Sequence, residues 1–408
     1  MRDRIEATFL LPGRGKPVED GVVVTDGPVI TYAGPAVDAP ETPDARVTRA
    51  TTVMPGLWDC HAHLVGGTTL DLNKGPLDSL PLRALRAGAD LRAALDAGIT
   101  SIREVGGLGT HLARAVAEGT LVGPAIYGAG AILSTTGGHG DLHSYPLAWV
   151  NDMAHTGEAR LCDGPSDCAR ATREQLRRNA KVIKICASGG VLSEIDDPVH
   201  QQFTVAEMKA IVEVAGMADR VVAAHCHGKP GIIAALEAGV HTIEHGTYLD
   251  EECAAAMRET GAILVPTRTI VEEIRESRAA PPYAQAKLDA IADIHRAAVA
   301  LAHEQGVRVA MGTDLALRAG SGPAAWGRNG RELPLLGDCG FTALEAIEAA
   351  TATAPETLGA LAPRSGQLRA GYDADVLILD VNPLDDLSVF ADTDRVTGVW
   401  RAGVRVKG

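Results

Sequence analysis

The sequence predicts an α/β protein, with a (β/α)8 barrel over residues 54–361 and one small β domain made from residues 1–53 and 362–408. Two patterns carry this prediction. Between about residues 54 and 361, short apolar runs alternate with longer Ala- and Leu-rich runs, which is typical of βα units around a parallel sheet. The two ends contain short β-prone pieces separated by turns.

The ends of the chain contain the candidate strands of the small domain. Near the N-terminus these are GVVV (21–24) and VITYAG (29–34), and near the C-terminus DVLILD (375–380), VTGVWR (396–401) and VRV (404–406). Neither end has enough apolar surface to fold alone. We therefore expect the two ends to pair into one small β-sandwich domain. The alternative is two separate flaps on the barrel.

The middle of the chain contains eight candidate barrel strands, which end near Asp59, Arg103, Tyr127, Lys184, His225, His245, Val265 and Met311. Helices are expected between them, for example over 81–97 and 205–218. The second of these begins with the capping box Thr204 to Glu207, and Thr342 to Glu345 begins another helix in the same way. Eight such units favour a closed (β/α)8 (TIM) barrel, in which functional groups lie at the C-terminal strand ends.

Three connections of this barrel are long and rich in Gly and Pro: about 131–165, 188–203 and 315–340. All three leave from the C-terminal ends of strands. We therefore expect them to overhang the mouth of the site.

Composition excludes several classes of function. The chain has 408 residues, of which 46% are hydrophobic, and it carries 52 acidic against 38 basic residues. A net charge of −14 argues against a nucleic-acid or anionic-membrane partner, because both require a basic surface. No apolar stretch approaches the roughly 18 residues of a membrane span, and residues 1–11 are too charged for a signal peptide. Seven cysteines without a CxxC motif fit free thiols in a reducing compartment, so we expect a cytoplasmic protein.

The strongest single motif is the pair His61 and His63 at the end of the first predicted barrel strand. Side chains alternate across a strand, so the two imidazoles point to the same face. Such a pair can bind a divalent cation such as Zn²⁺. The alternative is two ordinary polar residues at the edge of a loop.

Four further residues lie at predicted strand ends. These are Lys184, His225, His245 and Asp314, on strands four, five, six and eight. A single histidine at a strand end is usually a hydrogen-bonded surface residue. Six metal-competent groups in register with the barrel repeat instead predict a shared metal site at one rim.

The segments that carry these residues resemble the metal motifs of the amidohydrolase superfamily: PGLWDCHAH (55–63), IKICASGGV (183–191), IEHGT (243–247) and GTD (312–314). Three more segments, GGHGD (137–141), AHCHG (224–228) and NGREL (329–333), are similar to its imidazolonepropionase-related branch. That branch includes Xaa-Pro dipeptidases, arginine/lysine carboxypeptidases and ochratoxin hydrolases. The resemblance covers nearly the whole chain, although it weakens near residues 316–322.

The resemblance implies two divalent ions, for which Zn²⁺ suits the ligands most readily. It implies that His61, His63 and Asp314 bind the more buried ion, and that His225 and His245 bind the more exposed one. Lys184 would be carboxylated and shared, since a carbamate has two oxygens that can span a metal pair whereas an ammonium cannot ligate a cation. Water between two divalent ions loses proton affinity. Asp314 would then take up its proton and deliver it to the leaving nitrogen of an amide.

Four residues are candidate substrate contacts. In the related peptidases the positions that match His139 and His227 touch substrate. Tyr248 is a candidate hydrogen-bond donor to the scissile carbonyl or to a carboxylate, and Arg268 is a candidate for holding a substrate carboxylate. For each of the four, a purely structural or solvated role is the alternative.

We expect structural or solvated roles for the remaining histidines, and strand alternation predicts where three cysteines point. His143 is expected to stabilise a loop, and the other histidines outside the rim are read as structural or solvated: His111, His155, His200, His241, His295 and His303. Strand alternation points Cys60 and Cys226 away from the metal and places Cys186 on the face of Lys184.

The leading hypothesis is a binuclear metal-dependent amidohydrolase that cleaves an amide or peptide bond. Its substrate would be a small peptide or acyl-amino acid, cleaved with a dipeptidase or carboxypeptidase-like preference. C-terminal trimming of a modified peptide in natural-product biosynthesis is a narrower version. Hydrolysis of a cyclic amide, of the imidazolone or hydantoin type, is the first alternative. Oligomeric state stays open, with a homo-oligomer as one possibility.

Two further alternatives are disfavoured by particular residues. Heterocycle deaminases of this superfamily usually lack the strand-four lysine and carry a glutamate three residues after the strand-five histidine. Here Lys184 is present and Gly228 occupies the other position. A non-enzymatic scaffold would be expected to have lost metal ligands, and all six are present.

Overall fold

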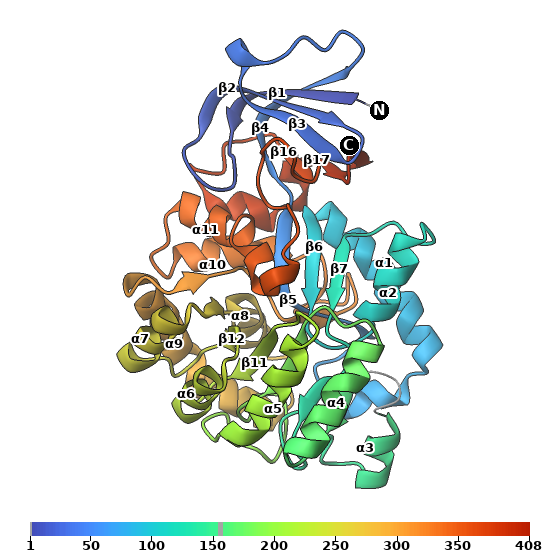
Figure 1. The fold of residues 1–408 in the computed structure, drawn as a ribbon, viewed down its shortest axis with the longest axis vertical. Helices are drawn as coiled ribbons and strands as arrows, with labels where there is room; N and C mark the ends of the chain where they lie inside the picture. The colour runs from blue at the N-terminus through green and yellow to red at the C-terminus, as the bar shows by residue number, and fades with distance from the viewer. Residues whose placement is uncertain (1, 154–157) are drawn as a thin grey trace.

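The computed structural model describes residues 2–153 and 158–408. Figure 1 shows a β-sheet that carries both labelled ends of the chain, lying above a larger body in which helices surround central strands. β4, which belongs to the sheet, leads directly into the body, where β5 begins two residues later.

The upper sheet has seven strands in the order β18-β17-β16-β4-β1-β2-β3. β4 joins the two ends of the chain, because it pairs parallel with β1 and antiparallel with β16. The apolar core beside this sheet contains Ile5, Val53 and Trp400, all fully buried. The strands predicted at both ends therefore share one sheet, and the alternative of two separate flaps is wrong. The strands are β1 (Arg2–Leu10), β2 (Val18–Asp26), β3 (Val29–Pro35), β4 (Arg46–Pro55), β16 (Val376–Leu379), β17 (Val396–Arg401) and β18 (Val404–Lys407).

The body contains two parallel sheets, in the orders β15-β5-β6-β7 and β14-β13-β12-β11-β10-β8-β9. Two backbone hydrogen bonds join the two sheets. Lys181 N donates to Gly128 O (2.8 Å), which links the β10 side to β7, and Cys60 N donates to Met311 O (2.9 Å), which links β5 to the β14 side. The strands are β5 (Leu57–Gly67), β6 (Ile99–Glu104), β7 (Ala125–Gly128), β8 (Ile132–Ser134), β9 (Ala159–Leu161), β10 (Ile183–Cys186), β11 (Val222–Cys226), β12 (Thr242–His245), β13 (Ile263–Val265), β14 (Arg308–Val309) and β15 (Leu315–Leu317).

Helices follow the strands and cover the outside of the body (Figure 1). They are α1 (Leu80–Asp96), α2 (Gly109–Ala117), α3 (Leu147–Met153), α4 (Pro165–Arg177), α5 (Val205–Gly216), α6 (Lys229–Ala238), α7 (Glu251–Thr260), α8 (Arg268–Ser277), α9 (Pro282–Glu304), α10 (Glu332–Gly337) and α11 (Ala343–Ala350). Both capping boxes are present: Thr204 and Glu207 begin α5, and Thr342 and Glu345 begin α11. The two predicted helices over 81–97 and 205–218 are thus confirmed within one or two residues.

The first barrel strand is longer than the sequence predicts. β5 continues past the predicted end at Asp59 to Gly67, so that both histidines of the pair lie within it. The extension is explained by pairing on both sides, because Ala62 lies opposite Glu104 of β6 and opposite Leu315 of β15. The predicted end near Met311 is also too late, since β14 ends at Val309. Such long-range pairing leaves no local signal in the sequence.

Two of the three long connections contain helices and strands, whereas 188–203 contains neither. The 131–165 connection contains β8, α3 and β9, and the 315–340 connection contains β15 and α10. Among the described residues, no helix is both long and apolar enough to cross a membrane.

Candidate metal centre

One group of metal-competent side chains comes from β5 and from the loop between β14 and β15. His61 and His63 lie on β5, and Asp314 lies between β14 and β15. Asp314 Oδ1 is 3.1 Å from His63 Nε2 and 3.5 Å from His61 Nε2. One ligand atom from each residue lies within 4.8 Å of the others, so the three can hold one ion.

The backbone at Asp314 is fixed by a buried carboxylate. Asp59 accepts hydrogen bonds from Thr313 N (3.1 Å), Thr313 Oγ1 (2.5 Å) and Asn329 Nδ2 (2.8 Å). Burial raises the pKa of Asp59 to about 6. These bonds hold the turn in which Asp314 has φ +60°, a left-handed conformation that is costly for a residue other than glycine. Asn329 of the NGREL segment thereby contributes to the site through Asp59.

Both β5 histidines have one ring nitrogen occupied by the protein. His61 Nδ1 donates to Glu244 Oε2 (2.7 Å), and His63 Nδ1 donates to the Gly106 carbonyl (2.8 Å). Glu244 is in turn held by Arg103 Nη2, at 2.7 and 2.8 Å from its two oxygens. Each histidine therefore presents its Nε2 to the site, as ligands oriented by carboxylates and carbonyls do in metal centres.

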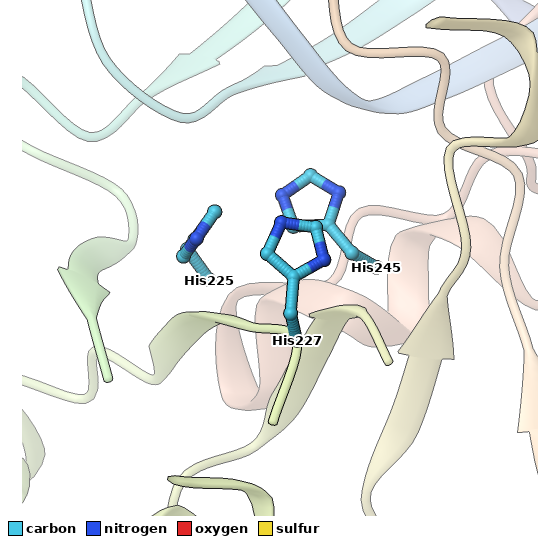
Figure 2. Close-up of side chains that lie close together, drawn as sticks. All are labelled: His225, His227 and His245. Carbon is cyan, nitrogen blue, oxygen red and sulfur yellow. The ribbon is translucent and has the colours of Figure 1, made fainter. Parts of the chain in front are cut away.

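A second group consists of three buried histidines from β11, β12 and the residue after β11. Figure 2 shows the rings of His225, His227 and His245 gathered around one space. The ring centroids are 4.7 to 4.9 Å apart, and one ligand atom from each lies within 4.8 Å of the others. His227, predicted to contact substrate, therefore also belongs to a group that can hold an ion.

Each histidine of this group also has a protein partner on one nitrogen. His225 Nε2 donates to the Gly189 carbonyl (3.0 Å). His227 Nδ1 is bonded to Thr247 Oγ1 and His245 Nδ1 to Thr267 Oγ1, both at 2.7 Å. The other nitrogen of each ring is free to face the shared space in Figure 2.

Lys184 on β10 lies between the two groups. Its Nζ is 3.3 Å from His61 Nε2, and the residue is 2% exposed. The ring of His61 lies 4.8 Å from that of His245, so the two groups adjoin. Burial lowers the pKa of the Lys184 amine below its usual value, although Glu244 acts in the opposite direction. A larger share of the amine is therefore neutral than at the surface.

The protonation states of most of these groups suit metal binding. The exception is His63: burial would lower its pKa, but the contact with Asp314 raises it. Burial lowers the pKa of His61 to about 4 and that of His227 to about 3, and it lowers the pKa of His225 and His245 well below the usual value. Burial would raise the pKa of Asp314, but His61 and His63 lower it to about 2. At neutral pH these four imidazoles are neutral lone-pair donors and the carboxylate is ionised, which are the forms that bind metal.

Both groups lie in the wall of one cavity of about 490 Å³. Much of the remaining wall is apolar and comes from α1, α8, α9 and the long connections. These apolar residues include Leu70, Leu72, Leu80, Ile132, Leu142, Val150, Val191, Leu192, Ile270, Val271, Ile274, Leu288, Ile291 and Leu317. Arg83, a cation in this wall, is paired with Glu158. The cavity thus combines a polar, metal-competent side with broad apolar walls.

The four predicted substrate contacts separate into two pairs. His139 and His227 line the cavity. The ring of His139 stacks on that of His225, with centroids 4.2 Å apart, and His139 Nδ1 lies 2.7 Å from Ser193 Oγ. Gly190 permits this approach, because a Cβ there would lie 2.1 Å from the His139 ring.

Tyr248 and Arg268 do not line the cavity. Tyr248 packs against an apolar cluster that includes Val191. Arg268 is buried, with its guanidinium engaged by Glu272 and by His295 Nδ1 (3.0 Å). The predicted contact of Arg268 with a substrate carboxylate does not fit this placement, because its charge is already neutralised behind the wall.

One histidine lies elsewhere than predicted. The sequence predicts His295 to be structural or solvated away from the rim; it is structural and fully buried, but it belongs to the cavity wall. A signal was present, because Leu288, Ile291 and Val299 are buried at helical spacing on the same face of α9. His143 lies in the 131–165 connection, where its Nδ1 is 3.4 Å from Ile195 N. His155 lies outside the described residues.

The three cysteines beside the ligands behave as strand alternation predicts. Cys186 lines the cavity, whereas Cys60 Sγ lies 3.5 Å from Ala354 O and Cys226 packs in the main apolar core. Burial raises the pKa of Cys60 and Cys186 to about 12. All seven cysteines are free and buried.

A parallel α/β body with histidine and carboxylate groups at its strand ends defines the class of metal-dependent hydrolases. Residues 52–406 match the model of the amidohydrolase family. The chain belongs to the amidohydrolase family.

Individual relatives support this assignment along the whole chain. The chain is 41% identical to ochratoxinase from Aspergillus niger over 99% of its own length and 86% of that protein. The crystal structure of A. niger ochratoxinase superimposes with a TM-score of 0.92 at 39% identity, covering 100% of this chain and 96% of that one.

A prolidase crystallised with N-methylphosphonate-L-proline superimposes with a TM-score of 0.91 at 32% identity, and both chains are fully covered. Imidazolonepropionase from Streptomyces griseus is more distant, at 27% identity over 97% of this chain and 95% of that protein. The predicted superfamily and branch are confirmed. The protein is a hydrolase of C–N bonds that cleaves amide or peptide bonds with the help of metal.

Proposed function

We propose that the protein uses two divalent ions, most suitably Zn²⁺, to hydrolyse the amide bond of a small peptide or acyl-amino acid that carries bulky apolar groups. The observation that carries this proposal is the pair of adjoining ligand groups, with a buried lysine between them, in the wall of a largely apolar cavity. In this proposal His61, His63 and Asp314 bind one ion, and His225 and His245 bind the other.

The donor set fits such ions. In each of the four ligand imidazoles one nitrogen is bonded to the protein and holds the ring in place. The other nitrogen of His61 lies beside Lys184 and that of His63 beside Asp314, which are themselves proposed ligands of the same ions. Imidazole and carboxylate ligands suit Zn²⁺. Bound at this position, divalent ions would lower the pKa of water and polarise a carbonyl oxygen.

Lys184 is proposed to bridge the two ions as a carbamate. Its neutral amine would add to CO₂, forming an N–C bond and releasing one proton, and the product carries one negative charge shared by two oxygens. Burial of the amine beside His61 supports this step, because it disfavours the ammonium form. An unmodified Lys184 ammonium would instead repel a cation in the same space.

Asp314 is proposed to move the proton in the reaction. Its Oδ1 lies against His63, and its low pKa keeps it ionised at neutral pH. It can accept a proton from the attacking water and deliver it to the leaving nitrogen. His139 and His227 line the same cavity and are proposed to contact the substrate around the scissile bond.

The cavity supports the choice of substrate class. Its apolar walls favour bulky apolar substituents, since burying such groups is the main favourable contribution in pockets of this kind. The relatives named ochratoxinase and prolidase, the latter complexed with N-methylphosphonate-L-proline, agree with this substrate class. C-terminal trimming of a modified peptide in natural-product biosynthesis is a narrower form of the same proposal.

The proposal also includes closure of the barrel and the boundaries of the two domains. The two bridging hydrogen bonds support closure of the eight main strands into a (β/α)8 barrel over residues 54–361. Residues 1–53 and 362–408 would form the flanking β-sandwich domain. A cytoplasmic location is part of the proposal, supported by the seven free thiols, whereas the oligomeric state is left open.

The test combines metal analysis with a substrate screen. Purified protein is assayed for bound metal and for hydrolysis of N-acyl amino acids and dipeptides with free and blocked C-termini, each in small and bulky apolar forms. We expect metal-dependent cleavage, with bulky apolar substrates preferred. If blocking the C-terminus abolishes cleavage, the enzyme is exo-acting. Absence of bound metal together with absence of amide cleavage contradicts the proposal.

Hydrolysis of a cyclic amide is the second candidate, because of the similarity to imidazolonepropionase. The same screen separates the two if it includes an imidazolone and a hydantoin. Ring opening without cleavage of any linear amide would favour this second candidate.

A further inference from the structure

His295 connects α9 to the turn that carries a proposed metal ligand. It lies in the middle of α9 and is fully buried. Its Nε2 lies 3.0 Å from the backbone oxygen of His245, and its Nδ1 lies 3.0 Å from Arg268 Nη1. Both ring nitrogens are therefore engaged by other parts of the protein.

The partners fix the tautomer of His295. A guanidinium can only donate hydrogen bonds, so Nδ1 must be the unprotonated acceptor. The proton of the neutral ring then lies on Nε2, which donates to the His245 carbonyl. Arg268 is itself held, since its backbone N donates to Glu332 Oε1 (2.8 Å) and its guanidinium pairs with Glu272. These contacts therefore allow His295 only the tautomer with its proton on Nε2.

The turn that this bond reaches is strained. His245 has φ +71° and Thr267, which is bonded to His245 Nδ1, has φ +56°. Left-handed conformations of this kind are costly for residues other than glycine and persist only where surrounding contacts enforce them. Two hydrogen bonds, one between His295 Nε2 and the His245 carbonyl and one between His245 Nδ1 and Thr267 Oγ1, hold His245 at its backbone and at its ring.

We infer that His295 is a positioning residue that holds the His245 turn, and that Arg268 serves it by fixing its tautomer. This inference rests on the proposed metal centre, in which His245 is a ligand. It assigns a role to two residues outside the ligand set. It also gives Arg268 a function different from the substrate contact predicted from sequence.

The test compares two amides at position 295. The amide nitrogen of Gln extends to the place of Nε2 and can donate to the His245 carbonyl, whereas that of Asn extends only to the place of Nδ1. His295→Gln should keep a Zn²⁺ affinity close to that of the unaltered chain, measured by chelator competition. His295→Asn should weaken one of two Zn²⁺ sites by about 10- to 100-fold, which is typical when a partner of a metal ligand is lost.

A control lies on the same helix. His303→Asn, in which the altered ring stacks on Phe341 away from the cavity, should leave both sites unchanged. Replacing Zn²⁺ with Co²⁺ adds a spectroscopic readout, because the absorption bands report ligand geometry. We expect altered bands in His295→Asn and nearly unaltered bands in His295→Gln. Equal behaviour of the Gln and Asn variants, whether both bind or both fail, would overturn the inference.

A second measurement needs no metal. ¹⁵N spectra of histidine-labelled, metal-free protein, assigned with His295→Gln, should show His295 protonated on Nε2 and unprotonated on Nδ1. The reverse tautomer would overturn the inference. If the unaltered chain binds no Zn²⁺, the proposed function fails instead, so the two failures are distinct.

Discussion

Replacement of Glu244 by Gln should weaken both folding and metal binding. Glu244 and Arg103 are each 0% exposed, and the two Glu244 oxygens accept from Arg103 Nη2, His61 Nδ1 and Thr242 Oγ1. Burial would raise the pKa of Glu244, but Arg103 and His61 lower it to about 2, so the carboxylate is charged throughout the neutral range. Gln preserves its shape but removes the charge and replaces one acceptor oxygen with an NH2 donor.

The magnitude follows from these contacts. Removing one partner of a buried ion pair leaves the other charge uncompensated and costs about 3–5 kcal/mol. The Gln amide also cannot accept from both His61 and Arg103 as strongly as a carboxylate does. His61 loses its orienting partner, which should lower metal affinity about 10- to 100-fold.

The assay is urea unfolding of the metal-free protein together with chelator competition for Zn²⁺. Glu273→Gln is the matched control, because Glu273 is 2% exposed and pairs with Arg328 (2.8 Å) and Arg331 (2.6 Å) but touches no proposed ligand. Arg328 and Arg331 are partly exposed and can be hydrated. The Glu273→Gln variant should therefore lose less stability than Glu244→Gln and no metal affinity. The reasoning is refuted if Glu244→Gln matches Glu273→Gln in metal affinity, or if its unfolding free energy changes by less than about 1 kcal/mol.

Other predictions concern separate features. Asp314→Asn should retain most of its metal and lose turnover by about 10²- to 10⁴-fold in the amide assay, and full activity would contradict the proton-transfer role. Thr204→Ala should lower the free energy of unfolding by about 0.5–2 kcal/mol through loss of the α5 cap, and an unchanged urea midpoint would be inconsistent with that cap. Because all seven thiols are buried, a thiol reagent should label the native protein slowly and the unfolded protein fully, whereas rapid native labelling would contradict the packing.

The sequence predicted the proposed ligands because their signals are local. Each of Lys184, His225 and His245 ends a short apolar run, and strand alternation places His61 and His63 on one face. Strand ends in a parallel α/β protein meet at one rim, so the convergence followed from the repeat alone. The capping boxes of α5 and α11 are equally local and were equally visible.

What the sequence did not predict depends on packing between distant elements. The length of β5 is set by pairing with β6 and β15, and neither contact is encoded within β5. Arg268 follows a strand end, as a substrate-binding arginine would, but α9 brings His295 against it and α8 supplies Glu272. The role of Asp59 likewise needs Thr313 and Asn329, which lie more than 250 residues away.

Metal stoichiometry measured alongside activity tests the central claim most directly. The purified protein is analysed for bound divalent ions and assayed on an apolar acyl-amino acid, then stripped with a chelator, and finally reloaded with Zn²⁺. We predict two ions per chain, loss of amide hydrolysis on stripping, and recovery on reloading. A stripped protein that still hydrolyses the amide at its original rate would contradict this account.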